Sequence, residues 1–344
     1  MGLTSVVVIG RNEGERLGSC VGSLRGERIV YVDSRSTDGS VELARSLGAA
    51  VVELDMARPF SAAKARNEGF ARAIQINPHA KYVQFVDGDC VVVEGWINAA
   101  MTFLDENPQY AAVAGRLRER FPEHSIYNGL CDLEWNTSAG DVDACGGIAM
   151  YRASAFQQAG RFDETVVAGE EPELCLRLRN AGWKIRRLDA EMALHDAAMT
   201  RFGQWWKRAV RGGYGGMDVA MRFEKGEGEF SRQVRSARIW AVGWPLTTLL
   251  ITGTTWALAG GRVAGFAVAL TLAAPPIQMA RVGIKGFLKC GDARTAAAYG
   301  VLMMLGKWAH LQGQYRYWRD RRAGRHLSLI EYKRPAEKDA VTHV

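Results

Sequence analysis

The tripeptide Asp87-Gly88-Asp89 follows directly on the apolar run YVQFV at residues 82–86. Two carboxylates one residue apart repel each other unless a cation neutralises them. Residues two apart in a strand point the same way, so both carboxylates at this strand tip could reach one hard cation, while the glycine lets a ligand approach the backbone. Such an ion can bridge a diphosphate and offset the charge that builds on it when a bond to it breaks. We therefore predict a Mg²⁺ or Mn²⁺ site at Asp87 and Asp89.

A second acidic group occurs in the segment GEEPE at residues 169–173, just before a helix-like pattern. The positive end of a helix dipole and its free N–H groups stabilise carboxylates in the first turn. A displacement at a carbon attached to a diphosphate needs a base on the face opposite the leaving group. Glu170 and Glu171 are the candidates for this base, and the alternative is ordinary enrichment of acidic residues in a first helical turn.

The elements that must position these residues alternate between strands and helices. Short β-branched runs predict buried strands, and these runs are 5–10, 28–33, 49–54, 81–87 and 110–116. Amphipathic segments between them predict helices that begin near Asp38 and Ser61 and one that stops before Pro108. This alternation implies a mostly parallel sheet with ligands at the carboxyl ends of its strands. The polar strand exits at 10–13, 33–38 and 87–89 should then lie together, and a last edge strand should end at His195.

Charge divides the chain into two parts. Residues 1–199 carry 21 Lys and Arg against 28 Asp and Glu, a net charge of −7, whereas residues 200–344 carry 23 against 9, a net charge of +14. Two uncharged apolar runs, 239–259 and 263–280, lie in the basic part with arginines and lysines on both outer flanks. About 20 apolar residues cross a bilayer as a helix, and flanking positive charge favours the cytoplasmic side. We expect a membrane hairpin with both ends cytoplasmic; two buried helices of a soluble domain are the alternative.

The six cysteines form no C-x-x-C pair and no cluster with histidine. Disulfide frameworks and structural zinc sites usually show such spacing. We therefore expect neither, and we expect a reducing, cytosolic setting for this part of the chain.

Six segments occur in an order and spacing that resembles the family 2 glycosyltransferases. They are VVVIGRNEGERLGSCVGSL, VDSRSTDGSVELA, AKARNEGF, FVDGDCVVVEGW, CGGIAMYRASAFQQAGRFDE and GEEPELCLRLRNAGW, within residues 3–196. The resemblance implies an inverting enzyme with a GT-A fold, a Rossmann-like α/β domain with a mostly parallel sheet that binds a nucleoside diphosphate-sugar. C-terminal membrane helices would follow this domain.

The resemblance also implies roles for individual residues. The expected donor is a UDP-sugar. The first two loops would bind its base and ribose, and the D-x-D residues and the arginine of A-R-N-x-G would bind its sugar and diphosphate. The implied nucleotide-sugar-binding residues are Arg11, Asn12, Glu13, Asp33, Ser34, Arg66, Asp87, Gly88 and Asp89. Arg11 and Ser34 depart from the family pattern, which usually has an aromatic residue and a second Asp there. Lys64 is left open between donor binding and a solvated charge.

For catalysis, the resemblance places Glu171 at the position of the usual catalytic Asp and Glu170 just before it. Cys145, Gly146 and Gly147 would form the loop where acceptor and donor sugar meet. His195 resembles a histidine that contributes to the metal or diphosphate site, so the implied metal ligands are Asp89, Asp87 and His195.

The segment Gln204-Trp205-Trp206-Lys207-Arg208 lacks the Q-x-x-R-W pattern of processive synthases of this family. This departure favours transfer of a single sugar. The acceptor would be a lipid-linked molecule or a glycan at the cytoplasmic face of the inner membrane, in cell-surface polysaccharide or glycolipid synthesis. Nucleic acid is not an expected partner, because no nucleic-acid module accompanies the basic tail.

The expected domain organisation has four parts: a GT-A catalytic domain at 1–200, an amphipathic interfacial linker at 201–238, a membrane region at 239–311 and a basic cytoplasmic tail at 312–344. A third membrane helix over 295–311 is left open, because Lys307 suits a packed or interfacial helix better. Two rival functions remain, a polyprenyl-phosphate sugar transferase and a catalytically inactive membrane scaffold. A sugar nucleotidyltransferase is disfavoured, since IGRNEGERL lacks a G-x-G-T-R loop.

Overall fold

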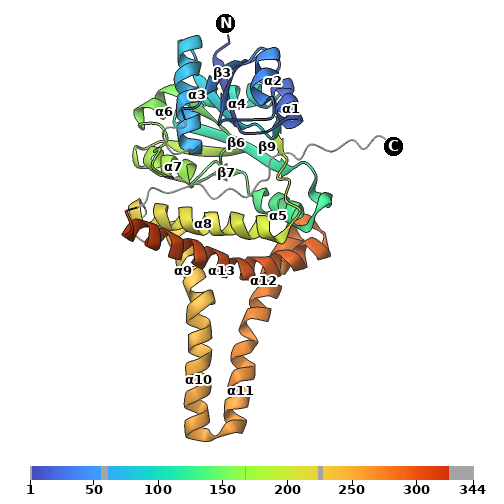
Figure 1. Ribbon diagram of the computed structural model, residues 1–344, viewed down its shortest axis with the longest axis vertical. Helices are drawn as coiled ribbons and strands as arrows, with labels where there is room; N and C mark the ends of the chain where they lie inside the picture. Colours follow the sequence, from blue (N-terminus) through green and yellow to red (C-terminus); the bar gives the residue numbers. More distant parts are fainter. Residues whose placement is uncertain (1, 56–60, 167, 224–227, 325–344) are drawn as a thin grey trace, which may run out of the picture. The chain divides into compact units, whose positions relative to one another are not determined.

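The computed structural model describes residues 2–55, 61–166, 168–223 and 228–324. These residues form two compact units (Figure 1). The first comprises residues up to Phe121 together with Glu134–Ala198, and the second comprises Pro122–Leu133 and the described residues from Met199 onward. The part of the expected basic tail beyond residue 324 lies outside the described residues.

The first unit is built on one sheet, which has nine strands in the described residues. The strands are β1 Thr4–Gly10, β2 Arg28–Asp33, β3 Ala50–Glu53, β4 Tyr82–Asp87, β5 Cys90–Val92, β6 Tyr110–Glu119, β7 Gly140–Asp141, β8 Ala149–Arg152 and β9 Lys184–His195. Their order is β3-β2-β1-β4-β8-β6-β9-β5, and β7 pairs with β9.

Strands β3, β2, β1 and β4 run parallel, and β8 is antiparallel to both β4 and β6. The β-branched residues of β1 and β4 are buried, as expected of strands covered on both faces. The carboxyl ends of β1, β2 and β4 therefore meet at one sheet edge, as the sequence predicts. Strand β9 is not at an edge: it lies between β6 and β5, because the short return strand β5 pairs with its last residues.

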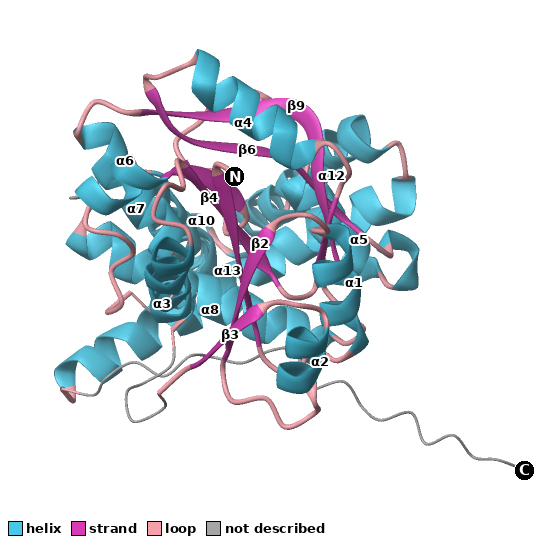
Figure 2. Cartoon of the chain, turned by 90° about the horizontal axis from the view of Figure 1, so that it is seen from above, coloured by secondary structure: helices cyan, strands magenta, loops and turns pink. Residues whose placement is uncertain are grey.

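The helices of the first unit are α1 Glu15–Ser23, α2 Ser40–Ser46, α3 Ala62–Ile76, α4 Trp96–Glu106, α6 Ala153–Gln158 and α7 Glu170–Asn180. Helix α3 packs against β1 and β2 (Figure 2). Ser61 caps its first turn by accepting a hydrogen bond from the Lys64 N–H at 3.1 Å. A Cβ atom at Gly69 would overlap Val7 of β1 and Val32 of β2, so this glycine permits the close approach of helix to sheet.

The second unit consists of helices in its described residues. They are α5 Ile126–Trp135, α8 Phe202–Arg222, α9 Glu229–Arg238, α10 Trp244–Ala259, α11 Gly261–Leu272, α12 Ala274–Cys290 and α13 Ala293–Arg322. The last two residues of α5 belong to the first unit. A short 3-10 turn, Pro122–His124, precedes α5, and a π-helical turn, Ile239–Gly243, precedes α10. Helix α13 packs along α8 and α12. Glycines allow this approach: Gly313 lies against Val210, and Gly300 lies against Met279.

Helices α10 and α11 run side by side as a hairpin that extends away from α8 and α13 (Figure 1). Their surface is apolar and exposed: Leu249 is 69% and Leu258 is 83% exposed, and Phe266 is 73% exposed. Among the described residues, one segment, Gly261–Cys290, is a helix long and apolar enough to cross a membrane. The run at 239–259 is divided into a π-helical turn and the 16-residue α10, and residues 295–311 belong to the packed helix α13. The two-span hairpin stays a prediction.

Candidate active site

The first two strand exits are tied together by hydrogen bonds. The Asn12 side-chain oxygen accepts a hydrogen bond from the Thr37 N–H at 2.7 Å, and the Asn12 N–H donates to Ser36 Oγ at 2.9 Å. The Ser34 N–H donates to the Gly10 carbonyl at 3.0 Å. Arg11 is exposed beside this pair of loops. Together the two loops form one polar rim at the carboxyl ends of β1 and β2.

Asp33 lies at the base of this rim and is 2% exposed. Its carboxylate accepts hydrogen bonds from the Tyr31 hydroxyl at 3.1 Å and from the Ser36 N–H at 2.8 Å. Burial and the nearby charge of Asp33 raise the pKa of Tyr31, so this hydroxyl stays a donor. Asp33 thus holds the second loop in shape, and a carboxylate still has further lone pairs with which it can contact a ligand.

Arg66 of α3 joins two of the predicted motifs. Its Nη1 lies 2.6 Å from Glu170 Oε1 at the start of α7, and its Nη2 lies 2.9 Å from Asp87 Oδ1 at the end of β4. The guanidinium also lies over the ring of Phe162, 5.8 Å from its centroid. Burial opposes the charge of Arg66, but Asp87 and Glu170 outweigh it and raise the pKa of Arg66. The site therefore holds a permanent cation with two anionic partners.

The glycine loop closes over this ion-pair cluster. A Cβ atom at Gly147 would lie 2.9 Å from Arg66 Nη2 and 3.8 Å from Asp87 Oδ2, and Gly146 has a φ of +91° that favours glycine. Gly88 is similarly confined, since a Cβ there would lie 3.1 Å from Glu13 Cγ and 3.3 Å from the Ile9 carbonyl oxygen. A side chain at Gly147 would therefore crowd Arg66 and Asp87.

Asp87 and Asp89 do not share a strand. Strand β4 ends at Asp87, Gly88 and Asp89 form a turn, and β5 begins at Cys90. The expectation that strand alternation points both carboxylates the same way is therefore wrong, because the chain reverses between them. Asp87 turns to Arg66 and keeps 36% of its side chain exposed, whereas the Asp89 side chain is 2% exposed.

Asp89 meets His195 instead. Its Oδ1 lies 3.3 Å from His195 Nε2 at the end of β9. The pairing of β5 with β9 sets this contact, because Cys90 lies opposite His195. Among the described residues, Asp89, Cys90 and His195 form a group that could hold a metal ion, and Asp87 is not a member of that group. A carboxylate oxygen and an imidazole nitrogen are ligands that Mn²⁺ accepts, so Asp89 and His195 are residues that would hold a divalent cation.

The two candidate bases face different surroundings. Glu171 is buried, and its Oε1 accepts hydrogen bonds from the Cys145 N–H at 2.7 Å, the Cys175 thiol at 2.9 Å and the Cys145 thiol at 3.2 Å. Burial raises the pKa of both thiols, so they remain donors. Glu170 instead points to Arg66. Arg66 thus links Glu170 to Asp87, and Glu171 anchors the glycine loop through Cys145.

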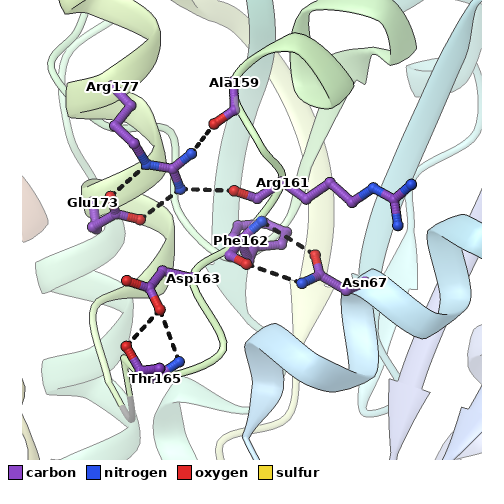
Figure 3. Close-up of polar contacts among 8 residues, drawn as sticks. All are labelled: Asn67, Ala159, Arg161, Phe162, Asp163, Thr165, Glu173 and Arg177. Atoms are coloured by element: carbon purple, nitrogen blue, oxygen red, sulfur yellow. Dashed lines mark hydrogen bonds and ion pairs between the residues drawn. The ribbon is translucent and has the colours of Figure 1, made fainter.

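A separate clamp supports the start of α7 (Figure 3). Glu173 is fully buried and pairs with Arg177, whose Nη2 donates to Glu173 Oε2 at 2.7 Å and to the Arg161 carbonyl at 2.7 Å. Asn67 of α3 holds the same loop, because its side chain exchanges hydrogen bonds of 2.9 and 3.1 Å with the backbone of Phe162. The glutamate that follows the candidate bases is therefore a positioning residue.

Several residues that surround the candidate site belong to no motif that the sequence analysis recognised. Trp135 packs its ring edge against His195, with centroids 4.7 Å apart, and Phe162 lies under Arg66. Cys175 and Tyr151 enclose Cys145 and Glu171. Lys64 is not solvated: it is 6% exposed, and its ammonium donates to the Asp55 carbonyl at 2.5 Å.

Comparison with known proteins shows which proteins the chain is similar to. Residues 5–160 match the family model Glycosyl transferase family 2. The Pre-mycofactocin glycosyltransferase of Mycobacterium tuberculosis is 29% identical over 234 residues, which cover 63% of this chain and 47% of that protein. Glycosyltransferase AglE of Haloferax volcanii is 21% identical over 232 residues, which cover 63% of this chain and 74% of that protein. The chain thus spans about half the length of the mycobacterial relatives.

A solved structure shares the fold. The mannosyltransferase PcManGT from Pyrobaculum calidifontis, in complex with GDP-Man and Mn²⁺, superimposes with a TM-score of 0.57 at 16% identity, over 92% of this chain and 87% of that chain. The sheet is therefore of the GT-A type, and the family match and the relatives together support a glycosyltransferase.

Proposed function

We propose that the protein transfers one sugar, with inversion, from a nucleoside diphosphate-sugar to a hydroxyl of a lipid-linked or glycan acceptor. The observation that carries this proposal is the cluster at Arg66, which joins Asp87, Glu170 and the backbone of Gly147. Four segments that are separate in the chain supply a cation, two carboxylates and a glycine loop. Such a site can hold a charged donor against an acceptor and exclude water from between them.

The donor would lie across the polar rim. The loops around Asn12 and Asp33 would contact base and ribose, and Arg66 would face the sugar diphosphate. A divalent cation held by Asp89 and His195 would offset the charge on the leaving diphosphate. The sequence favours a UDP-sugar, whereas the solved relative binds GDP-Man, so both belong in a donor screen.

Glu170 is the base that the geometry favours. It pairs with Arg66, which also contacts Asp87, whereas Glu171 has its Oε1 occupied by three donors. Positioned general bases contribute about 10²–10⁴-fold to rate. To act, Glu170 would accept the proton of the acceptor hydroxyl as that oxygen forms its bond to the anomeric carbon and the bond to the diphosphate breaks.

The setting we propose is the cytoplasmic face of the inner membrane, in cell-surface polysaccharide or glycolipid synthesis. The exposed apolar surface of α10 and α11 and the length of Gly261–Cys290 support a membrane-bound protein. Non-processive transfer rests on the departure from Q-x-x-R-W at residues 204–208.

One observation favours a second candidate, a polyprenyl-phosphate sugar transferase. Both candidate bases already have partners: Glu170 pairs with Arg66, and Glu171 accepts hydrogen bonds from two thiols. A phosphate acceptor is already ionised and needs no base, so this arrangement suits it. Substitution of Glu170 by Gln should then leave most of the turnover.

The test is release of nucleoside diphosphate from UDP- and GDP-sugars by the detergent-solubilised full chain, with Mn²⁺, Mg²⁺ or a chelator. We expect metal-dependent release that Asp89→Asn abolishes and that the control Asp189→Asn retains, since Asp189 is an exposed partner of Arg116. Equal release by wild type and Asp89→Asn would refute the proposed site. Failure to bind any donor in calorimetry would support the inactive scaffold.

A further inference from the structure

The second unit contains a pocket formed by α9, α12 and α13. Its polar lining consists of Ser236, Gln278, Lys285, Lys289, Tyr299 and Lys307. The remaining lining is apolar or glycine and includes Val282, Met303 and Met304. No step of the proposed sugar transfer uses these residues.

The charge of this pocket has one sign. Lys285 and Lys289 lie one turn apart on α12, and Lys307 reaches the same space from α13. Among the described residues that line the pocket, none is Asp or Glu. Lys285 and Lys289 are exposed and Lys307 is half-buried, so the three side chains offer cationic donors to an anion that enters the pocket from solvent. Burial lowers the pKa of Lys307, because the charged form of the side chain is less stable away from water. An anion bound in the pocket would stabilise that charged form.

The apolar lining indicates what kind of molecule carries that anion. Met303 and Met304 form apolar walls beside the lysines. On α12, Ile284 is 62% and Leu288 is 79% exposed, and both belong to the segment that is apolar enough to cross a membrane. A site with an anion-binding end next to exposed apolar helix surface suits a phosphate group that carries hydrocarbon chains.

We propose that this pocket binds the phosphate head group of an anionic membrane lipid. Lys285, Lys289 and Lys307 would donate to the phosphate oxygens, with the Ser236 and Tyr299 hydroxyls as further donors in reach of the pocket. The lipid chains would lie along the exposed side of α12. This site is independent of the sugar-transfer proposal, because binding rather than turnover reports on it.

The experiment measures binding to the full chain in a neutral detergent by calorimetry. The probes are dioctanoyl phosphatidic acid, dioctanoyl glycerol and inorganic phosphate. We expect saturable binding of the phosphatidic acid. The glycerol lipid tests whether chains suffice, and inorganic phosphate tests whether the anion suffices; comparable affinity for either one would overturn the proposal of a lipid phosphate.

The variants are Lys285→Ala/Lys289→Ala/Lys307→Ala and a charge-matched control, Arg232→Ala/Arg281→Ala/Arg294→Ala, whose residues are exposed and lie outside the pocket lining. Because the pocket variant lacks all three charged donors to the phosphate, we expect it to bind at least about tenfold more weakly while the control changes little. Equal weakening in both would mean non-specific attraction and would refute the site. The single variant Lys307→Met removes one charge with little loss of volume, and it provides the same comparison if the triple variant does not fold.

Discussion

Arg66 and Glu170 are 104 residues apart in the chain, and Arg66 Nη1 lies 2.6 Å from Glu170 Oε1. Their side chains are 4% and 11% exposed. A buried charge requires a partner, so neither group can be changed without consequence for the other. The pair fixes the start of α7 against α3, and through Asp87 it also fixes the end of β4.

Arg66→Met should therefore lower both stability and donor binding. Removal of one partner from a buried ion pair costs about 3–5 kcal/mol, and here two carboxylates lose the same partner. Thermal unfolding and donor calorimetry measure the two effects. Arg72→Met on the same helix is the control, because Arg72 is exposed and its guanidinium donates to Gln75 at the surface. If Arg66→Met and Arg72→Met behave alike, the central role of Arg66 is wrong.

Glu170→Gln and Glu171→Gln should separate catalysis from positioning. We expect Glu170→Gln to lower kcat by about 10²-fold or more, as loss of a general base does. Glu171→Gln should mainly lower thermal stability and raise the KM for acceptor, since Glu171 holds the backbone N–H and thiol of Cys145. The reverse pattern in kcat would assign the base to Glu171, as family resemblance implies.

Gly147→Ala tests the closeness of the glycine loop to Arg66. The added methyl group would lie 2.9 Å from Arg66 Nη2, so the guanidinium or the loop must shift. Misplacement by about 1 Å can cost about 10²-fold in rate. Gly22→Ala is the control, because a Cβ there meets nothing within 4 Å. A fully active Gly147→Ala enzyme would contradict this account of the loop.

Glu173→Ala should reduce stability by about 3 kcal/mol, because it leaves the partly buried Arg177 without its carboxylate partner. The loop at Ala159–Arg161, which Arg177 also holds, should loosen with it. Thermal unfolding measures the loss, and Glu68→Ala on the exposed side of α3 serves as control. A loss no larger than that of Glu68→Ala would show that Glu173 does not act as a clamp.

Lys307→Met should stabilise the protein at neutral pH, and the gain should shrink in alkali. Burial lowers the pKa of Lys307 below 10.5 in the folded state, so the unfolded state binds this proton more tightly. The wild type therefore gains stability as pH rises from the lowered pKa toward 10.5, whereas the variant lacks this gain. Unfolding midpoints of both proteins from pH 7 to pH 10 test this; a pH-independent difference would contradict it.

Several parts of the fold could be predicted from local patterns. The strands β1, β2 and β4 follow from continuous β-branched runs, and α3 begins where the Ser61 cap predicts. The carboxyl ends of parallel strands lie at the same end of a sheet, so the polar rim at Asn12 and Asp33 and the end of β4 at Asp87 could be predicted to lie together.

Other features depended on contacts between distant segments. Whether Asp87 and Asp89 share a face depends on the turn at Gly88, and that turn forms because β5 pairs back onto β9. Spacing in the sequence contains no information on this pairing. The burial of Lys64 also depends on packing, since its ammonium donates to the backbone carbonyl of Asp55.

By itself, the sequence determined the kind of fold, the strand exits that carry polar groups and the residue types available for binding a diphosphate and a cation. These follow from periodicity and side-chain chemistry, which are local properties. Only the tertiary structure decided which carboxylate meets which partner: Asp87 and Glu170 meet Arg66, Asp89 meets His195, and Glu171 meets two thiols. The physical reason is that a buried charge takes its partner from whatever segment the packing brings within about 3 Å, and packing is a property of the whole chain.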